Sequence, residues 1–410
     1  MSVGIKGRVL AWSVPFLAEI GALLRSVVLA WATGPEELGR AMVLVLVLRL
    51  TEMISDIGVE RLLMTSKDGD DPRFMSALQG AALLRGLAMA AMLLALAVPM
   101  GLMLPDGASL PEYMALAVIP LMRAFLNLDY RLSERNFSYL PMAMVEGGSV
   151  LAMLAALPVI GYLVPDHRAM LVALIVQAAA QVLLSHVVAR RRWTMHFDRV
   201  ILNRAFRFGT PLVINAFLMF LTFQADRLIV AGWFGWAEVG IYGVALQLAS
   251  LPAQIAGRAA GSLLAPKLRV ALHNDTLRPV AKAAVQAHVA LAGAFALGFA
   301  LLAPEAIALV YGAQFRPSFP LALALGLAAA FRILRTPHSQ LAVASGRTGD
   351  PARANLWRAL ALVPAIGLAV MGEPLLTVAL AAMVGEMLAT LRAHVLMKLS
   401  FKPISKEALS

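Results

Sequence analysis

The sequence contains no cysteine and few charged residues, which make up only 14% of its 410 positions. The lack of cysteine excludes disulfides, thiolate catalysis and cysteine-ligated metal ions. Soluble domains carry about 25% charged residues. The scarcity of charge therefore argues against a soluble protein, although the length would accommodate two or three soluble domains.

Motifs of the common enzyme classes are also absent. The chain has no glycine-rich P-loop, no nucleophile elbow, no His-Glu-x-x-His sequence and no clustered metal ligands. We therefore expect a protein that is not an enzyme and has no ATP site. Any active transport would be driven by an ion gradient, so a coupling Na⁺ or H⁺ is the sole cofactor to expect.

Long apolar segments dominate what is present. Hydrophobic residues make up 60% of the sequence and recur in runs of the roughly 20 residues that cross a bilayer as a helix. We predict an all-α polytopic membrane protein of about twelve transmembrane helices. The predicted spans are 10–32, 38–64, 78–104, 112–133, 140–163, 168–190, 205–232, 238–265, 281–311, 318–344, 352–371 and 373–398. Glu19 and Arg25 interrupt the first run, which favours a transmembrane helix over a cleaved signal peptide.

Basic residues concentrate in alternate loops. One set of loops contains 21 Lys and Arg residues, in the segments 6–8, 67–73, 131–135, 190–207, 267–282, 347–353 and 398–406. The other set contains only Arg40, Arg168 and Arg316. This bias predicts that both termini lie in the cytoplasm, and it accounts for the net charge of +11 without nucleic acid as a partner.

The chain divides into two predicted halves. The basic segment near its middle is interpreted as a linker between an N-terminal six-helix bundle, 1–195, and a C-terminal one, 196–410. GPEELG at 34–39 aligns with GWAEVG at 235–240, either as a trace of an internal repeat or by chance. Six helices per half would relate the bundles by a pseudo-two-fold axis along the membrane normal, with the ligand site in the cleft between them.

Arginines lie inside the predicted spans, where a charge costs about 2.5–3.5 kcal/mol and therefore faces water or a partner. Polar residues at helical spacing occur on six spans, which favours a hydrated lumen over helix–helix contacts alone. A guanidinium binds phosphate through two parallel hydrogen bonds. We therefore predict an anion-binding cavity lined by Arg25, Arg49, Arg123, Arg258, Arg332 and Arg335.

Alternatives remain for individual residues. Arg49 could pair with Glu52 or Asp56 on its own helix, and Arg332 and Arg335 repel each other unless an anion bridges them. Acids within the spans could bind a coupling ion or neutralise an arginine; they are Glu19, Asp56, Glu146, Asp226 and Glu386. The span histidines could carry protons or simply be packed; they are His288 and His338.

Three stretches resemble one family. They are GPEELGRAMVLVLVLRLTEMISDIGVERLLM at 34–64, LNRAFRFGTPLVINAFLMFLTFQADRLIVAGWFGWAEVGIYGVALQLASLP at 202–252 and LLAPEAIALVYGAQFRPS at 301–318. Their order and spacing are similar to those of the Wzx-type flippases of polysaccharide biosynthesis, in the multidrug/oligosaccharidyl-lipid/polysaccharide exporter superfamily. The resemblance covers nearly the whole chain.

The resemblance implies two six-helix bundles around a V-shaped cleft in a bacterial inner membrane. It implies that alternating access flips a polyprenyl-pyrophosphate-linked oligosaccharide toward the periplasm, for O-antigen or exopolysaccharide synthesis, possible partners being a glycan polymerase and a chain-length regulator. In the related lipid II flippases, arginines on the first, second and eighth helices line the cavity. Arg25, Arg49 and Arg258 lie on the corresponding helices here. Those flippases have fourteen helices, which argues against lipid II as the substrate of this chain.

Three other functions compete with this one. A drug or cation antiporter of the same superfamily should have an acidic or aromatic cavity, whereas central arginines outnumber acids here. A polymerase or ligase of glycan assembly would share the hydropathy but generally carries a large periplasmic loop, and no such loop is predicted. A non-transporting scaffold would have no need of the central arginines.

Overall fold

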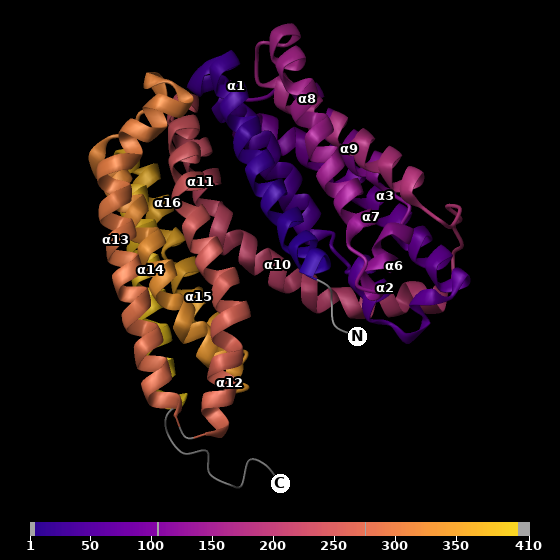
Figure 1. Cartoon of the computed structure of the whole chain (residues 1–410). Coiled ribbons are helices and arrows are strands. Elements are labelled where there is room, and N and C mark those ends of the chain that lie inside the picture. Colours follow the sequence, from indigo (N-terminus) through magenta and orange to yellow (C-terminus); the bar gives the residue numbers. More distant parts are fainter. Residues whose placement is uncertain (1–4, 105, 275, 401–410) are drawn as a thin grey trace. The chain divides into compact units, whose positions relative to one another are not determined.

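The computed structural model describes residues 5–104, 106–274 and 276–400. These residues form helices joined by short loops, with no strand among them (Figure 1). Nine helices in this part of the chain are long and apolar enough to cross a membrane, and each of the twelve predicted spans falls on helical segments. The all-α polytopic membrane fold is therefore confirmed.

Contacts divide the chain into two compact units, Met1–Phe220 and Leu221–Ser410. The prediction placed this division at 195/196, at the basic linker. Helix α10 (Arg199–Trp233) instead runs across the division, so the linker and the first turns of α10 belong to the N-terminal unit.

The N-terminal unit is built from nine helices and the beginning of α10. These are α1 (Ile5–Ile54), α2 (Val59–Thr65), α3 (Pro72–Met103), α4 (Leu110–Ala115), α5 (Val118–Arg123), α6 (Asp129–Arg135), α7 (Leu140–Met142), α8 (Gly148–Leu163) and α9 (Arg168–Val188). A π-helical turn, Ala143–Gly147, joins α7 to α8, and α8 packs along α9 (Figure 1).

Helix α1 contains the first two predicted spans. Gly34, with φ +80° and ψ 178°, interrupts its helical backbone between them. The second span was predicted to continue to residue 64, but α1 ends at Ile54. Gly58 adopts a left-handed backbone (φ +69°), and its amide donates to Oδ1 of Asp56 at 3.0 Å. This local turn competes successfully with helix continuation.

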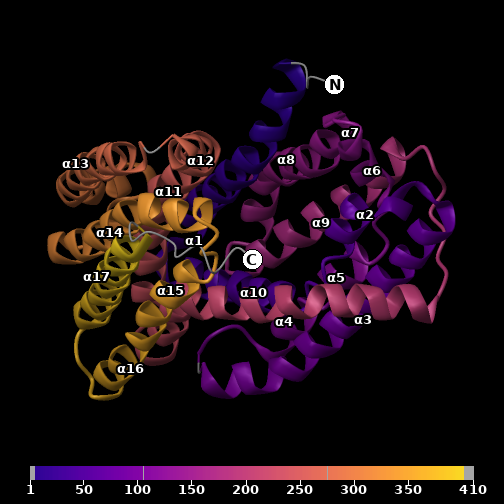
Figure 2. The same ribbon diagram turned by 90° about the horizontal axis from the view of Figure 1, so that it is seen from below.

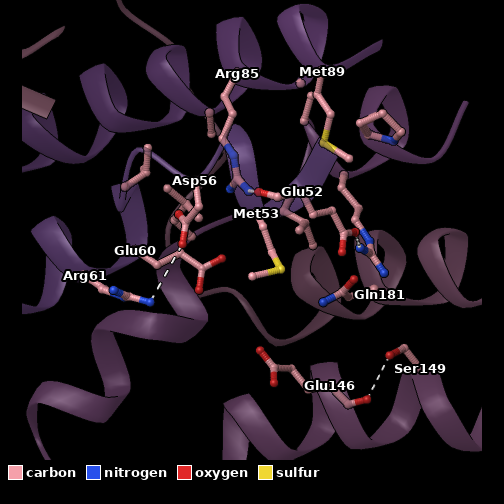
Figure 3. A pocket seen from close by; sticks show the side chains of 18 of the residues that line it. Glu52, Met53, Asp56, Glu60, Arg61, Arg85, Met89, Glu146, Ser149 and Gln181 are labelled. Atoms are coloured by element: carbon pink, nitrogen blue, oxygen red, sulfur yellow. Dashed lines mark hydrogen bonds and ion pairs between the residues drawn. The ribbon is translucent and has the colours of Figure 1, made fainter. Parts of the chain in front are cut away.

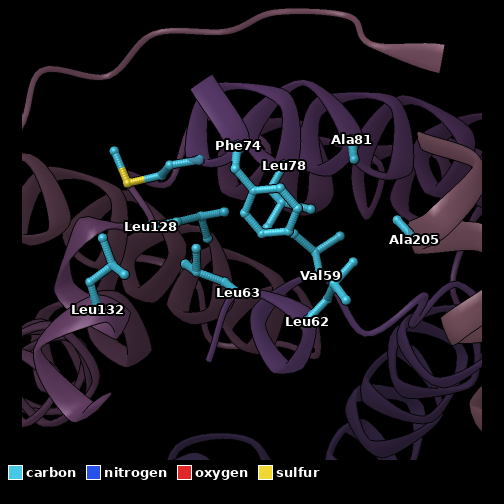
Figure 4. Packing of buried hydrophobic residues seen from close by; sticks show 10 residues of the cluster. Val59, Leu62, Leu63, Phe74, Leu78, Ala81, Leu128, Leu132 and Ala205 are labelled. Atoms are coloured by element: carbon cyan, nitrogen blue, oxygen red, sulfur yellow. The ribbon is translucent and has the colours of Figure 1, made fainter. Parts of the chain in front are cut away.

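The fourth predicted span, 112–133, is likewise not one helix. It is divided into α4, α5 and α6, with non-α segments at 116–117 and 124–128. Asn127 explains the second break. Its Oδ1 accepts a hydrogen bond from the backbone N–H of Asp129, and its own backbone N–H donates to Ser185 Oγ. Apolar side chains of α2, α3 and α6 hold these short elements together around Leu63 and Phe74 (Figure 4).

The C-terminal unit continues from α10 through seven further helices. These are α11 (Trp236–Ala259), α12 (Ala265–His273), α13 (Leu277–Tyr311), α14 (Phe319–Ala344), α15 (Asp350–Leu360), α16 (Leu362–Val370) and α17 (Leu375–Ser400). Helix α14 is central in this unit and contacts α11, α13 and α17. Figure 2 shows α17 lying along α14 and α15. Small side chains such as Ala292, Ala296 and Ala330 let these helices approach closely.

Candidate functional site

The N-terminal unit contains a cavity of about 610 Å³ lined by many polar side chains (Figure 3). They come from the end of α1 and the turn after it, from α2, α3, α5, α8 and α9, and from the π-helical turn before α8. The polar lining residues are Glu52, Asp56, Glu60, Arg61, Arg85, Arg123, Glu146, Ser149, Gln177 and Gln181. So many polar groups within an apolar chain indicate a hydrated cavity rather than a lipid-facing surface.

A smaller cavity of about 170 Å³ adjoins the first. Glu52, Arg123 and Gln177 line both cavities, and Arg25 and Arg49 complete the polar lining of the smaller one. Three of the six predicted anion-binding arginines are therefore brought together in the N-terminal unit. We call the smaller cavity, which Arg25, Arg49 and Arg123 line, the basic end of the site.

The three arginines differ in their partners. Arg25 is buried, its Nη1 donates to Gln177 Oε1 at 3.4 Å, and its Nε has no hydrogen-bond partner. Arg49 is exposed and forms no ion pair within the described residues. Arg123 pairs with Glu52, its Nη1 lying 2.5 Å from Oε1. One carboxylate thus faces three guanidinium groups, and the basic end carries an excess of two positive charges.

The other end of the larger cavity is acidic. Asp56, Glu60 and Glu146 line it, and Glu60 and Glu146 both pair with Arg131, Glu60 Oε2 at 2.9 Å from Nη2. Glu134 binds the same guanidinium at 2.9 Å. Three carboxylates share one arginine, so this end carries an excess of negative charge. The cavity is therefore bipolar.

The arrangement predicted for the second span, 38–64, is wrong as stated. Arg49, Glu52, Asp56 and Glu60 were expected on one helix, but the break after Ile54 separates the first two from the others. Arg49 pairs with neither acid: Glu52 turns to Arg123, and Asp56 lies 3.8 Å from Arg61. Glu52, Asp56 and Glu60 nevertheless all line the larger cavity.

In the C-terminal unit, the predicted pair Arg332 and Arg335 is bridged by Glu386. The guanidinium of Arg332 lies 2.8 Å, and that of Arg335 3.1 Å, from its carboxylate oxygens. Arg358 on α15 also pairs with Glu386, at 2.9 Å. The anion that the arginine spacing required is thus a side chain of the protein itself, 1% exposed.

Sequence reasoning missed Arg131 and Arg358. Arg131 was counted only as a loop charge, because span 112–133 was treated as one helix. Arg358 lies well inside the predicted span 352–371, the position that singled out the other arginines, and this signal could have identified it.

The remaining candidates lie apart from these clusters. Arg258 is exposed near the end of α11, and Glu19 is half-buried in α1 beside the cavity-lining Ala18. Asp226 is buried and accepts a hydrogen bond from the hydroxyl of Tyr242 at 3.2 Å. Within the described residues, no three His, Cys, Asp or Glu side chains are placed to hold a metal ion.

A further ionic cluster lies at the ends of the predicted spans of the N-terminal unit. His167, just before α9, places Nδ1 2.6 Å from Glu37 Oε2 and Nε2 2.9 Å from Glu112 Oε2. Burial alone would lower the pKa of His167, but its hydrogen bonds to the two carboxylates outweigh that effect and raise the pKa above its usual range. The imidazolium therefore joins α1, α4 and the loop before α9.

Solved structures share this fold. A structure described as "Lipid II flippase MurJ, inward closed conformation" aligns over 95% of this chain and 87% of its own, with a TM-score of 0.70 and 15% identity. An inward-facing multidrug resistance MATE family transporter aligns over 95% and 97%, with a TM-score of 0.59 and 14% identity. A point mutant of the VcmN MATE transporter of Vibrio cholerae aligns over 96% of each chain, with a TM-score of 0.58 and 14% identity.

Sequence comparisons give a narrower result. The succinoglycan biosynthesis transport protein ExoT of Rhizobium meliloti is 27% identical over 219 residues, which are 53% of this chain and 42% of that protein. The matched segment thus spans less than half of this relative. A family model described as "Polysaccharide biosynthesis protein" matches residues 28–320, well over half of the chain, and confirms the resemblance. The chain belongs to this polysaccharide biosynthesis protein family.

Proposed function

We propose that this protein is a flippase that moves polyprenyl-pyrophosphate-linked glycan repeat units from the cytoplasmic to the periplasmic leaflet by alternating access. The product would serve surface polysaccharide synthesis, as O-antigen or exopolysaccharide. In this proposal the protein lies in the bacterial inner membrane with both termini in the cytoplasm, and a glycan polymerase and a chain-length regulator act on its product.

The observation that carries the proposal is the uncompensated positive charge at the basic end. Arg25, Arg49 and Arg123 line a cavity within an apolar unit, and the lining contains one carboxylate, Glu52, which pairs with Arg123. Keeping such charges near a bilayer is costly unless an anion neutralises them. A pyrophosphate carries the required charge and offers oxygens for bidentate guanidinium bonds.

The family and the fold agree with this cargo. The glycan would occupy the polar cavity, while the polyprenyl chain stays in the bilayer through a gap between helices. We assign Arg25, Arg49 and Arg123 to the pyrophosphate. Arg332 and Arg335 take a supporting role, since both already pair with the buried carboxylate of Glu386.

A second candidate function is ion-coupled antiport of organic cations. The acidic end of the cavity, with Asp56, Glu60 and Glu146, favours it, because carboxylates attract cations. Arg131 and Arg61 occupy these carboxylates, however. A cation would have to displace an arginine in order to bind, which makes this function the weaker candidate.

The test is mass spectrometry of polyprenyl-linked glycans in the host inner membrane, with the gene present, deleted, or replaced by Arg25→Ala. We expect a complete lipid-linked repeat unit to accumulate on the cytoplasmic leaflet in both altered strains. Loss of cationic-drug resistance without accumulation would favour the antiporter. Repeat units that accumulate on the periplasmic leaflet would contradict the flippase and indicate a polymerisation step.

A further inference from the structure

Three histidines converge from three helices of the C-terminal unit: His288 on α13, His338 on α14 and His394 on α17. The rings of His338 and His394 meet edge to face with centroids 5.3 Å apart, and Nε2 of His338 lies 3.2 Å from Nδ1 of His394. His338 is 4% exposed, whereas the other two are half-buried. The anion site in the N-terminal unit uses none of them.

The hydrogen bonds fix the protons of the neutral pair. Nδ1 of His338 lies 3.0 Å from the carbonyl oxygen of Leu334, which can only accept, so Nδ1 carries the proton. Nε2 of His338 is then an acceptor, and Nδ1–H of His394 must donate to it. This leaves Nε2 of His394 unprotonated, with no hydrogen-bond partner among the described residues.

We propose that the His338–His394 pair is a proton-binding site that couples transport to a proton gradient. This rests on the proposed flippase function. A proton from water forms an N–H bond at Nε2 of His394, and the same bond breaks when the proton returns to water. Uptake breaks no existing hydrogen bond, and the new charge is shared with His338 through the bond already present.

The charges around the pair explain how a proton would act on conformation. Glu386 and His394 lie on one face of α17, eight residues apart, and face Arg335 and His338 of α14. Three arginines already share Glu386. A proton on the pair adds positive charge to an interface that already has an excess, so it disfavours this packing of α14 against α17.

The groups that act on His338 come from the helices packed around it. They are His394 of α17 and His288 of α13, and no carboxylate is among them. His288 places Nδ1 2.8 Å from the carbonyl oxygen of Ala284, so in the neutral ring Nδ1 carries the hydrogen and Nε2 is an acceptor. Among the described residues no carboxylate acts on His338, so a proton shared with it can be released again, as a coupling site requires.

The chain offers a sharp variant and a matched control. His394→Asn keeps an amide N–H at the position of Nδ1 and so retains the donor to His338, but it cannot take up a proton. His273→Asn is the control, because His273 makes the same type of Nδ1 contact to a carbonyl, that of Arg269, and is exposed on α12. Unfolding curves in detergent should be alike for both variants.

Two readouts separate this inference from the flippase proposal. The first is ¹⁵N NMR of histidine-labelled full-length protein in nanodiscs, in which we expect the ring-nitrogen signals of the pair to shift as the pH is lowered and His394→Asn to abolish that shift. A pair that does not titrate overturns the inference, whatever the protein transports.

The second readout is flipping of a fluorescent undecaprenyl-pyrophosphate-linked monosaccharide in proteoliposomes. We expect a gradient of one pH unit to raise the rate of lipid flipping by the wild type and by His273→Asn up to about tenfold. The rate of lipid flipping by His394→Asn should be the same with and without the gradient. A full gradient response in His394→Asn overturns the inference. No flipping by the wild type under any gradient overturns the flippase proposal, and the titration still decides whether the proton site exists.

Discussion

The two units use the arginines inside their apolar helices in opposite ways. In the C-terminal unit, Arg332, Arg335 and Arg358 converge on Glu386, and the cluster is nearly closed to solvent. In the N-terminal unit, three arginines open into a cavity and share only Glu52. Each cluster has one carboxylate for three arginines. The arginines are structural where that carboxylate is buried and pairs with all three, and available for a ligand where it is partly exposed and pairs with only one. The burial of the carboxylate, rather than the number of arginines, distinguishes the two.

The largest expected effect comes from removing the carboxylate on each side. Glu386→Gln leaves three buried guanidinium groups without a counter-charge, and losing one partner of a buried ion pair costs about 3–5 kcal/mol. Glu52→Gln is the matched variant; it should cost about 0–1 kcal/mol, because Glu52 and Arg123 are each about 30% exposed. Unfolding in detergent measures both. Equal losses would break the contrast between the units.

The next effect concerns the geometry of the anion site. Arg25→Lys keeps the charge but loses the planar fork, so it should restore part of the glycan export that Arg25→Ala removes. Export is measured as surface polysaccharide per cell, with membrane insertion checked by immunoblot. If Arg25→Lys and Arg25→Ala are equally inactive, bidentate geometry rather than charge is decisive; if both export normally, Arg25 does not bind the cargo.

A smaller effect is the pH dependence of stability, which the titratable His167 should produce and the permanently charged arginines should not. Folding raises the pKa of His167, so its stabilising contribution is fully present below its unfolded pKa of about 6.5 and is lost as pH rises through the folded value. Between pH 6 and 9 we expect stability to fall by on the order of 1 kcal/mol, and His167→Gln to remove this slope. The arginine clusters should show no such slope. A flat wild-type profile would contradict the role assigned to His167.

The smallest effect is expected at the rim of the larger cavity. Asp56→Asn keeps the acceptor for the Gly58 amide and loses only the 3.8 Å pair with Arg61, which is 59% exposed. Such pairs contribute about 0.2–1 kcal/mol or nothing measurable, so transport and unfolding should be nearly unchanged. A large loss of transport would instead revive Asp56 as an ion-coupling residue.

Most of the fold followed from hydropathy, whereas the local breaks did not. Apolar runs of membrane-spanning length identify helices because the bilayer demands that every backbone group be paired within its segment. The end of α1 depends on a single hydrogen bond, from Gly58 to Asp56, and the break before α6 depends on Asn127 and the distant Ser185. Periodicity cannot reveal such competition.

The sequence predicted which arginines could form the site, but it predicted only part of how they are arranged and paired. Position inside an apolar span singled out Arg25, Arg49 and Arg123, which line one cavity, and the spacing of Arg332 and Arg335 suggested an anion between them. The sequence could not show that Glu386, more than fifty residues away, is that anion, since three-dimensional packing alone brings α17 beside α14.

The most direct test is native mass spectrometry of the full chain with undecaprenyl pyrophosphate and with uncharged undecaprenol. The wild type should retain the pyrophosphate in preference to the alcohol. Arg49→Ala should reduce that preference by about tenfold or more, since a lost hydrogen bond to a charged group is worth about 1.5–3 kcal/mol. Arg61→Ala, which also removes an exposed arginine of this unit, should leave it intact. Equal retention of both lipids by the wild type would contradict an anion site in the N-terminal unit.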